Sequence, residues 1–357
     1  MGENANVCGG LRSMTKKTTI KDIADKLEVS PSSVSRALTN EPGVSDDLRE
    51  RVFDAASRLN YIPNSSAKSL KTSRSKTVGL IVSDIRNPFF LDFMSGVERV
   101  LFPREYKFIV CNTGEDRKKE EIYIKWLIGQ GVEGILSSPY QDGSNENNAL
   151  LYRRAMKNNI PVVFYDRLLK EIKVIDSVTL DNRQAIMNGV MYLRECGHER
   201  IGICLHRRGI YTIEERYAGF LKACEILRIE VIEDWIIDDA TDPVEASKRL
   251  KMILGRAHRP TALISTNQYI NELLLRVARE LKLSVPGELS LMGFDDLSLN
   301  DLVDPPITTI RQPVSDMGKI AATLLMGRID GDSVDRSTVV LKAELLKRES
   351  VSVLSGP

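Results

Sequence analysis

The sequence predicts a small all-α head followed by a two-lobed α/β body built on doubly wound parallel sheets. Helical patterns that begin at serine caps fill the first part of the chain, up to about residue 63. From residue 77 on, apolar runs of strand length alternate with helical stretches, which is typical of parallel sheets covered on both faces. Because the body has about 280 residues, more than one such sheet needs, two similar lobes are expected.

The composition is that of an ordinary globular protein, with 42% hydrophobic and 28% charged residues among 357. No apolar run approaches the roughly 18 residues that span a bilayer, and the first residues lack the pattern of a secretory signal. A cytoplasmic protein without a membrane partner is therefore expected. The net charge of +1 is uneven, since residues 1–76 carry 13 Lys and Arg against 9 Asp and Glu. A basic head favours nucleic acid as its partner.

The five cysteines and three histidines do not follow a metal-binding pattern. The cysteines are odd in number, form no C-x-x-C pair and lie mostly in apolar runs, which predicts reduced thiols in the core. The histidines are scattered along the chain. Neither a metal site nor a cofactor is expected.

The head begins with two short helices joined by a tight turn. Apolar residues recur at helical spacing from Thr18 to Leu27. Ser30 is then a predicted N-cap and Pro31 the first residue of a second helix that runs to about Leu38. This arrangement predicts a helix-turn-helix, whose second helix enters the major groove of DNA.

The outer face of the second helix carries the candidate DNA contacts, which are Ser32, Ser33, Ser35 and Arg36. Small hydroxyls can bond bases or phosphates, and an arginine can hold guanine O6 and N7 together. On this stretch alone, a solvated serine-rich surface helix is an equally good interpretation. A third helix capped by Ser45 completes the predicted DNA-binding domain at residues 14–63, and a Ser, Thr, Lys and Arg linker follows at 64–76.

The segment IKDIADKLEVSPSSVSRALTNEPGVSDDLRERVFDAASRLNYIPNSSAKSLKT resembles the DNA-binding head of the lac repressor-like (LacI/GalR) transcription regulators from end to end. The resemblance implies that Ser32 and Ser33 select the operator, and that residues 64–71 form a hinge helix. It implies that Ala67, Lys68 and Leu70 lie at the hinge and the minor groove, with Leu70 wedged between base pairs; a plain core leucine is the alternative. Residues 1–13 precede the family pattern, so an early start codon or a disordered tail without function is expected.

Nine strands are predicted in the body at 78–83, 107–112, 134–138, 162–166, 177–181, 200–205, 235–238, 261–266 and 289–294. Open α/β sheets bind ligands beyond the carboxyl ends of their strands. The residues just past these ends are Asn87, Phe89, Phe90, Asp166, Arg167, Asn267, Asp295 and Asp296, and Arg216 joins them from the helix after RIGICL. Carboxylates, amides and an arginine beside aromatic rings suit a polyhydroxyl ligand.

The body at residues 77–357 resembles the same family in GHERIGI, ERYAGF, VPGELSLMGFDD and TTIRQP. This implies the fold of periplasmic sugar-binding proteins, with the chain crossing between the lobes near Asp166, Asp295 and Gln312. The effector-binding residues implied by the resemblance are Phe89, Phe90, Asp166, Arg216, Asn267 and Asp295. For each of them, a helix cap or a salt bridge of the lobes is the alternative.

Two positions depart from the family pattern. The Gly-Pro that usually follows RIGICL is replaced by residues 206–209, His-Arg-Arg-Gly, and the aspartate that usually follows Asn267 is replaced by Gln268. Arg207 and Arg208, together with Arg167, suggest the hypothesis of an anionic effector such as a sugar phosphate or sugar acid. Ordinary exposed loop arginines are the alternative.

The resemblance implies a homodimeric DNA-binding transcription regulator, a repressor, that recognises a near-palindromic operator in double-stranded DNA under the control of a sugar or sugar derivative. Control by a protein partner is the alternative. An enzyme is disfavoured because the chain lacks G-x-S-x-G, P-loop and metal-spaced histidine motifs. An exported solute receptor is disfavoured because a signal peptide is not apparent. The C-terminus has no added leucine-heptad helix, which favours a dimer over a tetramer.

Overall fold

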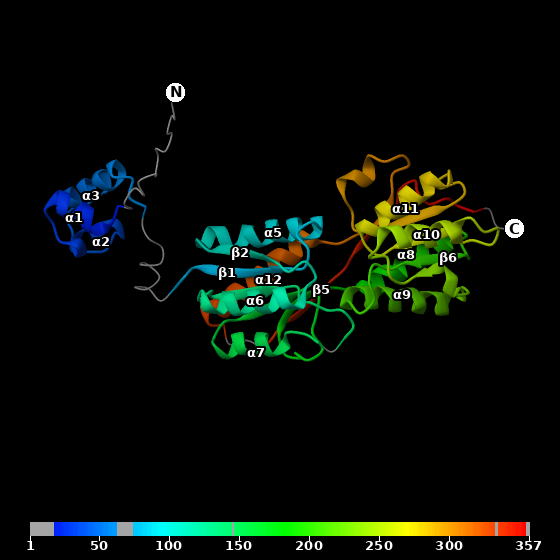
Figure 1. Cartoon of the computed structure of the whole chain (residues 1–357), viewed down its shortest axis with the longest axis horizontal. Helices are drawn as coiled ribbons and strands as arrows, with labels where there is room; N and C mark the ends of the chain where they lie inside the picture. Colours follow the sequence, from blue (N-terminus) through cyan, green and yellow to red (C-terminus); the bar gives the residue numbers. More distant parts are fainter. Residues whose placement is uncertain (1–17, 63–73, 145, 333–334, 355–357) are drawn as a thin grey trace, which may run out of the picture. The chain divides into compact units, whose positions relative to one another are not determined.

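The chain is divided into two compact units, a head and a body, and the boundary along the sequence lies between Ser75 and Lys76 (Figure 1). The computed structural model describes residues 18–62, 74–144, 146–332 and 335–354. The predicted extension, and the hinge with Ala67, Lys68 and Leu70, lie outside these described residues.

The head consists of three helices, α1 (Ile20–Leu27), α2 (Pro31–Leu38) and α3 (Asp46–Arg58). The side chain of Ser30 accepts a hydrogen bond at the start of α2 and that of Ser45 does so at the start of α3, as predicted. Small apolar residues from all three helices pack into one core, which consists of Ile23, Ala24, Val34, Ala37, Val52, Ala55 and Ala56. The helix-turn-helix is therefore held by its own core.

The body contains two six-stranded sheets, one in each lobe. The first sheet has the order β11-β5-β4-β3-β1-β2, and all its pairs are parallel. Its strands are β1 (Thr77–Val82), β2 (Lys107–Asn112), β3 (Gly134–Ser137), β4 (Val162–Tyr165), β5 (Asp176–Leu180) and β11 (Thr338–Leu341).

The second sheet repeats this topology with the order β12-β10-β9-β8-β6-β7. Its pairs are parallel except for the antiparallel edge strand β12. Its strands are β6 (Ile201–Cys204), β7 (Ile236–Ile237), β8 (Ala262–Ser265), β9 (Ser290–Phe294), β10 (Thr308–Arg311) and β12 (Glu344–Leu346). The predicted doubly wound fold class is confirmed.

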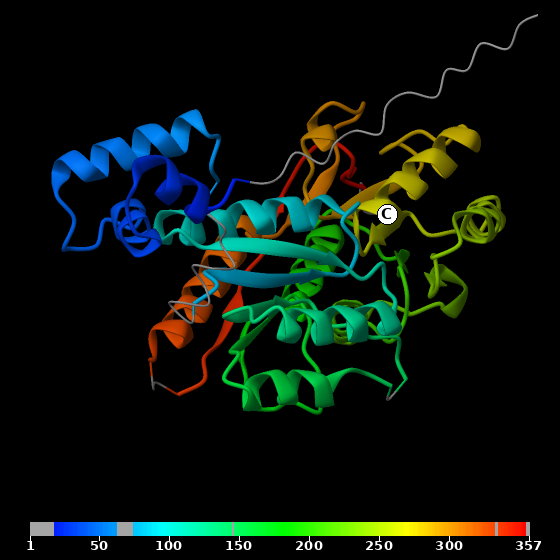
Figure 2. The same cartoon turned by 60° about the vertical axis from the view of Figure 1, so that its left-hand side comes forward.

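Helices cover both faces of each sheet. On the first sheet, α5 (Pro88–Leu101) and α12 (Val314–Asp330) pack on one face, and α6 (Arg117–Gly129) and α7 (Ala149–Lys157) on the other (Figure 2). On the second sheet the two pairs are α8 (Asn182–Glu195) with α9 (Tyr211–Leu227), and α10 (Pro243–Leu254) with α11 (Gln268–Glu280). Short 3-10 turns lie at Phe102–Arg104, Glu233–Trp235 and Ser298–Asp301.

The alternation of apolar side chains along β1 explains the two helix layers. Val78, Leu80 and Val82 belong to the core beneath α5 and α12, whereas Ile81 belongs to the core beneath α6 and α7. Because successive side chains of a strand point to opposite faces, an unbroken apolar run must be covered on both sides.

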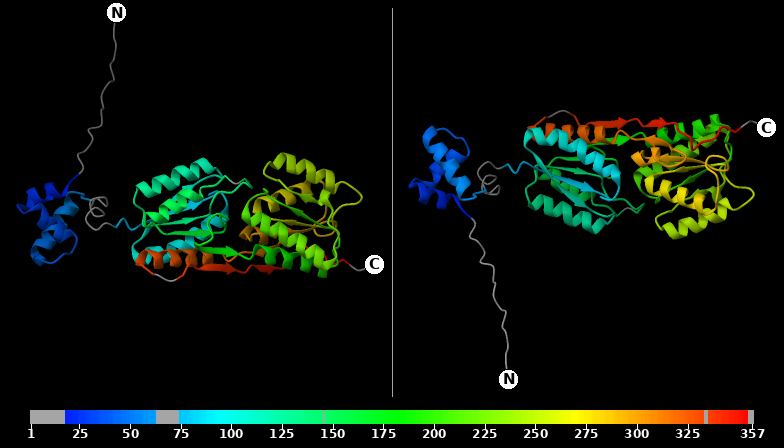
Figure 3. Two further views of the ribbon diagram at one scale, coloured as in Figure 1. Left: turned by 90° about the horizontal axis from the view of Figure 1, so that it is seen from below. Right: turned by 90° about the horizontal axis from the view of Figure 1, so that it is seen from above.

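The chain passes between the lobes at three places. It leaves the first sheet after β5 at Asp181, returns from β10 to α12 at Gln312 and Pro313, and leaves again between β11 and β12 (Figure 3). The crossing near Gln312 was predicted correctly. The predictions near Asp166 and Asp295 were wrong, because the strands on either side of each of these residues belong to the same sheet.

The nine predicted strands are all present, but three strands were missed. β10, β11 and β12 have three or four residues each, and their apolar runs, of which Val339–Leu341 is the longest, are too short to indicate a strand from the sequence. Four cysteines, Cys111, Cys196, Cys204 and Cys224, are buried and free, which confirms the core thiols among the described residues. No helix in the described part of the chain is long and apolar enough to cross a membrane.

Helices α5 and α12 cross at two glycines, which allow the backbones of the two helices to come into close contact. A Cβ atom on Gly318 would lie 2.2 Å from the backbone oxygen of Phe93, and one on Gly96 would lie 2.0 Å from that of Ser315. Neither contact can be relieved by a side-chain movement, because both obstacles are backbone atoms.

Gly318→Ala is therefore expected to lower the free energy of unfolding by about 1–3 kcal/mol, since the two helices must separate. Gly129→Ala is the matched control. Gly129 is also helical but has no atom within 4 Å of its would-be Cβ, so this change is expected to stabilise the body by about 0.5–1 kcal/mol. Urea unfolding followed by circular dichroism measures both values, and equal effects of the two changes would contradict the packing argument.

Candidate functional site

The four candidate DNA contacts lie on one short helix, α2, in the head. Ser32 and Arg36 are exposed, and Ser33 and Ser35 are half-buried. The Ser30 hydroxyl accepts from the backbone N–H of Ser33 at 3.1 Å and shares hydrogen bonds with the hydroxyls of Ser32 and Ser33, at 2.8 and 2.9 Å. The first turn of α2 thus presents a cluster of hydroxyls with an arginine one turn further along, a surface that fits the major groove of DNA.

A second candidate site is a cavity of about 60 Å³ between the two lobes of the body. It is lined by Asn87, Phe89, Phe90, Asp166, Arg167, Ile210, Thr212, Ile213, Arg216, Asn267, Asp295 and Gln312. The fold thus brings together all six residues that the sequence suggested for effector binding. They come from elements of both lobes that start or end at the carboxyl edges of the two sheets.

Arg216, in the second turn of α9, is the buried cation of this cavity. Its Nε donates to the Asn182 side-chain oxygen at 2.7 Å, and its Nη1 donates to the backbone oxygen of Thr266. The guanidinium lies 3.5 Å from the centre of the Phe294 ring. Burial lowers the pKa of Arg216, and the nearby carboxylates of Asp295 and Asp166 oppose that shift.

Asp166 and Asp295 occupy equivalent positions in the two lobes. Each follows the fourth strand of its lobe, β4 or β9, and each has a left-handed backbone, with φ of 63° and 71°. Burial raises the pKa of both carboxyl groups, and Arg167 and Arg216 respectively oppose the shift. Two partly desolvated carboxyls therefore face the cavity, one from each lobe, and both are ready acceptors for ligand hydroxyls.

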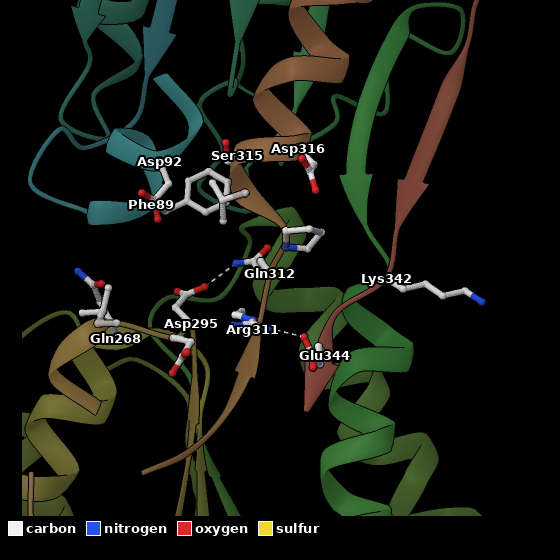
Figure 4. Close-up of a pocket in the computed structure, with 14 residues that line it drawn as sticks. Phe89, Asp92, Gln268, Asp295, Arg311, Gln312, Ser315, Asp316, Lys342 and Glu344 are labelled. Carbon is white, nitrogen blue, oxygen red and sulfur yellow. Dashed lines mark hydrogen bonds and ion pairs between the residues drawn. The ribbon is translucent and has the colours of Figure 1, made fainter. Parts of the chain in front are cut away.

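Gln312 connects Asp295 to the segment that crosses between the lobes. Its amide Nε2 donates to the Asp295 carboxylate at 2.5 Å (Figure 4). In Figure 4, Phe89 lies above this hydrogen bond, at the start of α5. The same three residues also line a more open hollow of about 550 Å³ on the side of the crossing segments. The Asp295–Gln312 bond thus separates the inner cavity from the outer hollow.

Aromatic rings form the apolar wall of the cavity. Phe89 and Phe90 pack edge to face, with ring centres 5.1 Å apart, and Phe90 also packs edge to face on Tyr165 at 6.3 Å. Such a wall offers an apolar face to a ring-shaped ligand.

Two of the lining amides also cap helices. The Asn87 side chain accepts from the backbone N–H of Phe89, and the Asn267 side chain accepts from that of Ile270. Asn267 therefore caps α11, as the alternative interpretation proposed, and it also lines the cavity. Gln268, which follows Asn267, is 5% exposed and lines the more open hollow.

Glu115, which the sequence analysis missed, pairs with two of the three arginines that motivated the anionic-effector hypothesis. Arg167 donates to its two carboxylate oxygens at 2.9 and 2.7 Å, and Arg207 of the other lobe lies 3.7 Å from it. Arg208 forms an equally close pair with Glu214, at 2.8 and 2.9 Å. Glu115 lies just past β2, so the rule applied to the other strand ends would have found it.

A second contact joins the lobes beside this ion pair. The Arg207 Nη2 donates to the backbone oxygen of Gln141 at 3.0 Å, and the backbone N–H of Tyr211 donates to the Gln141 side chain at 2.8 Å. Gly209 and Gly143 meet so closely that a Cβ on Gly209 would lie 2.3 Å from the Gly143 Cα. The unusual segment 206–209 thus holds the lobes together in this structure.

No group of three or more metal-ligating side chains occurs within the described ranges of the chain. The binding chemistry available in the cavity is therefore that of carboxylates, amides, guanidinium groups and aromatic rings.

Two family models match the chain. The model of the bacterial regulatory proteins of the lacI family matches residues 19–64, and that of the periplasmic binding protein-like domain matches residues 190–351. The probable HTH-type transcriptional regulator EndR of Paenibacillus polymyxa is 35% identical over 89% of this chain and 92% of its own length. The chain belongs to the lacI family of bacterial regulatory proteins. It is a DNA-binding transcriptional regulator.

Other relatives of this lacI-family chain match at nearly full length. The ribose operon repressor of Haemophilus influenzae is 30% identical over 93% of this chain and 98% of its own. The structure of the transcriptional regulator CelR in complex with cellobiose matches with a TM-score of 0.68 and 28% identity, over 94% of this chain and all of its own. The lac repressor dimer bound to its operator has the same fold, with a TM-score of 0.81 at 23% identity over 94% of this chain and all of its own.

The ion pair at Glu115 predicts a pH-dependent contribution to stability. Burial alone would raise the pKa of Glu115, but Arg167 and Arg207 outweigh it and lower the pKa from an ordinary 4.5 to about 2. A shift of that size corresponds to about 3 kcal/mol that is present above the unfolded-state pKa and lost as pH falls toward the folded-state value.

Glu115→Gln is therefore expected to lower the free energy of unfolding at pH 7, and the difference from the wild type is expected to be about 1 kcal/mol smaller at pH 3.8. Urea unfolding at the two pH values measures it. A difference that does not change with pH would mean that the carboxylate contributes through packing alone.

Proposed function

We propose that this regulator is a homodimeric repressor whose affinity for a near-palindromic operator is set by a sugar or sugar derivative bound between its lobes. The observation that carries the proposal is the cavity itself. A buried guanidinium, two opposed carboxyls and an aromatic wall converge there from both lobes. This set supplies donors, acceptors and an apolar face, which together suit a polyhydroxyl ring.

The roles of the lining residues follow from their chemistry. Asn182 and Thr266 take two of the five N–H donors of Arg216, which leaves both donors of Nη2 and one of Nη1 for ring or hydroxyl oxygens of a ligand. Asp166 and Asp295 accept from ligand hydroxyls on opposite sides, one from each lobe. Phe89 and Phe90 cover the apolar face of the ring. The ligand therefore gains contacts to both lobes at once, so its binding is coupled to the separation of the lobes.

The size of the cavity suggests how the coupling works. About 60 Å³ holds about two water molecules, so a sugar ring requires the lobes to rearrange. Gln312 lies on a segment that crosses between the lobes and donates a hydrogen bond to Asp295. A ligand that binds Asp295 therefore affects a residue of the connection between the lobes. A coupling free energy of about 1–3 kcal/mol to operator binding is expected.

In the head, Ser32 and Ser33 are proposed to select the operator, with Ser35 and Arg36 adding contacts, and Ala67, Lys68 and Leu70 of the hinge to bind the minor groove. The protein is proposed to act in the cytoplasm and to catalyse no reaction. The relatives support this proposal, because their names describe transcriptional regulators and repressors.

The proposal predicts the outcome of a thermal-shift screen of sugars, sugar acids and sugar phosphates on the full-length chain. A ligand at about 100 times its dissociation constant is expected to stabilise the wild type by about 2.7 kcal/mol. Arg216→Ala and Asp295→Ala are expected to abolish the shift. Glu215 is a half-buried partner of Arg183 outside the cavity lining, and Glu215→Gln is expected to retain the shift. If a broad panel shifts nothing, control by a protein partner replaces the sugar hypothesis.

Arg36→Ala is expected to weaken binding to the duplex that the wild type selects from a random pool, by about 1–3 kcal/mol. If Arg36 holds a guanine, the preference at one base pair of each half-site is also lost. Fluorescence anisotropy with single-base operator variants measures both effects. An unchanged preference at every position would assign Arg36 to a phosphate.

A further inference from the structure

Glu115 lies where the two lobes meet beside the cavity. It follows β2 with a left-handed backbone, φ 58°, and its backbone N–H donates to the Ser83 oxygen at 3.0 Å. Its side chain is only 20% exposed. The carboxylate is therefore fixed in place at the carboxyl edge of the first sheet.

The carboxylate of Glu115 accepts one hydrogen bond from each terminal nitrogen of Arg167. Both terminal nitrogens of Arg167 point to Glu115, and Nη2 also donates to the Ser83 hydroxyl at 3.3 Å. The remaining Nε lies 3.6 Å from Asp166. Arg167 lines the cavity at 7% exposure, and its Nε is buried without a hydrogen-bond partner, so the pairing with Glu115 offsets its charge without using every donor.

The same carboxylate faces Arg207 from the other lobe, at 3.7 Å, and Arg207 also donates to Gln141. Of the charged residues that line the cavity, Arg167 is paired with Glu115, which lies beside the cavity and also faces Arg207. What remains is one arginine, Arg216, between two carboxyl groups, Asp166 and Asp295. With Arg167 already paired, an added negative charge meets Arg216 as the one cation of the cavity lining that has no ion pair to Glu115.

We propose that Glu115 makes the cleft select uncharged polyhydroxyl ligands over anionic ones, because it holds Arg167 in a bidentate ion pair and so withholds the cavity's second cation from the ligand. The proposal rests on the proposed sugar-binding function of this cleft. It replaces the anionic-effector hypothesis suggested by the arginines at 167, 207 and 208.

The first test uses inorganic phosphate as the probe, on full-length protein at constant ionic strength. Phosphate is expected to raise the melting temperatures of the wild type and of the control Glu215→Gln only by the same non-saturable amount, as an excluded salt does. In Glu115→Gln, where Arg167 is released, phosphate is expected to raise the melting temperature with a saturable dependence. The double variant Glu115→Gln with Arg167→Ala is expected to lose that gain. A saturable gain in the wild type, or none in Glu115→Gln, overturns the proposal.

The second test compares each neutral sugar with its phosphate and its acid by calorimetry, for example glucose with glucose 6-phosphate and gluconate. The wild type is expected to bind the neutral member of a binding series at least tenfold more tightly. Glu115→Gln is expected to reduce that ratio at least tenfold, and Glu115→Asp, which keeps the charge, to preserve most of it. Equal or tighter binding of an anionic member by the wild type overturns the proposal without requiring any variant to fold.

The two tests separate the two proposals. If no member of any series binds the wild type, the sugar-binding function fails, whereas the phosphate experiment still decides whether Glu115 withholds Arg167. If sugars bind but without preference for the neutral form, only the role of Glu115 fails.

Discussion

The buried guanidinium of Arg216 is the interaction on which the cleft depends. A charge taken out of water must be matched by hydrogen bonds and nearby opposite charges, or it costs several kcal/mol. Here the match comes from Asn182 at the start of α8, Thr266 at the end of β8 and the ring of Phe294 at the end of β9. One side chain thus fixes α9 against the carboxyl edge of the second sheet. The remaining donors of this arginine face the cavity.

The repeated topology of the lobes explains why the acidic residues oppose one another. Both sheets place their fourth strand beside the third and fifth, and both turn sharply after it through an aspartate in a left-handed conformation. When the two carboxyl edges face each other, Asp166 and Asp295 come to opposite sides of one cavity. A ligand that forms hydrogen bonds on both sides of the cavity then binds best at one particular separation of the lobes.

The structure also changes the interpretation of the two arginines in the segment at residues 206–209. In the sequence, these arginines suggest attraction for an anionic ligand. In the fold, Arg208 is bound to Glu214 and Arg207 reaches Glu115 and Gln141 of the opposite lobe. The charge of Arg207 therefore serves contact between the lobes, whereas that of Arg208 serves an ion pair within the second lobe.

The sequence by itself determined the fold class, the three helices of the head, nine of the strands and the six candidate effector residues. These features follow from local patterns: capping serines, helical periodicity, apolar runs, and the rule that ligands bind past the carboxyl ends of parallel strands. Only the tertiary structure decided the three short strands β10, β11 and β12 and two of the three crossings between the lobes. It also decided the ion pairs of Glu115 with Arg167 and Arg207. They depend on which segments distant in sequence pair with one another, and neither ion pairing nor strand pairing at such separations leaves a periodic pattern in the chain.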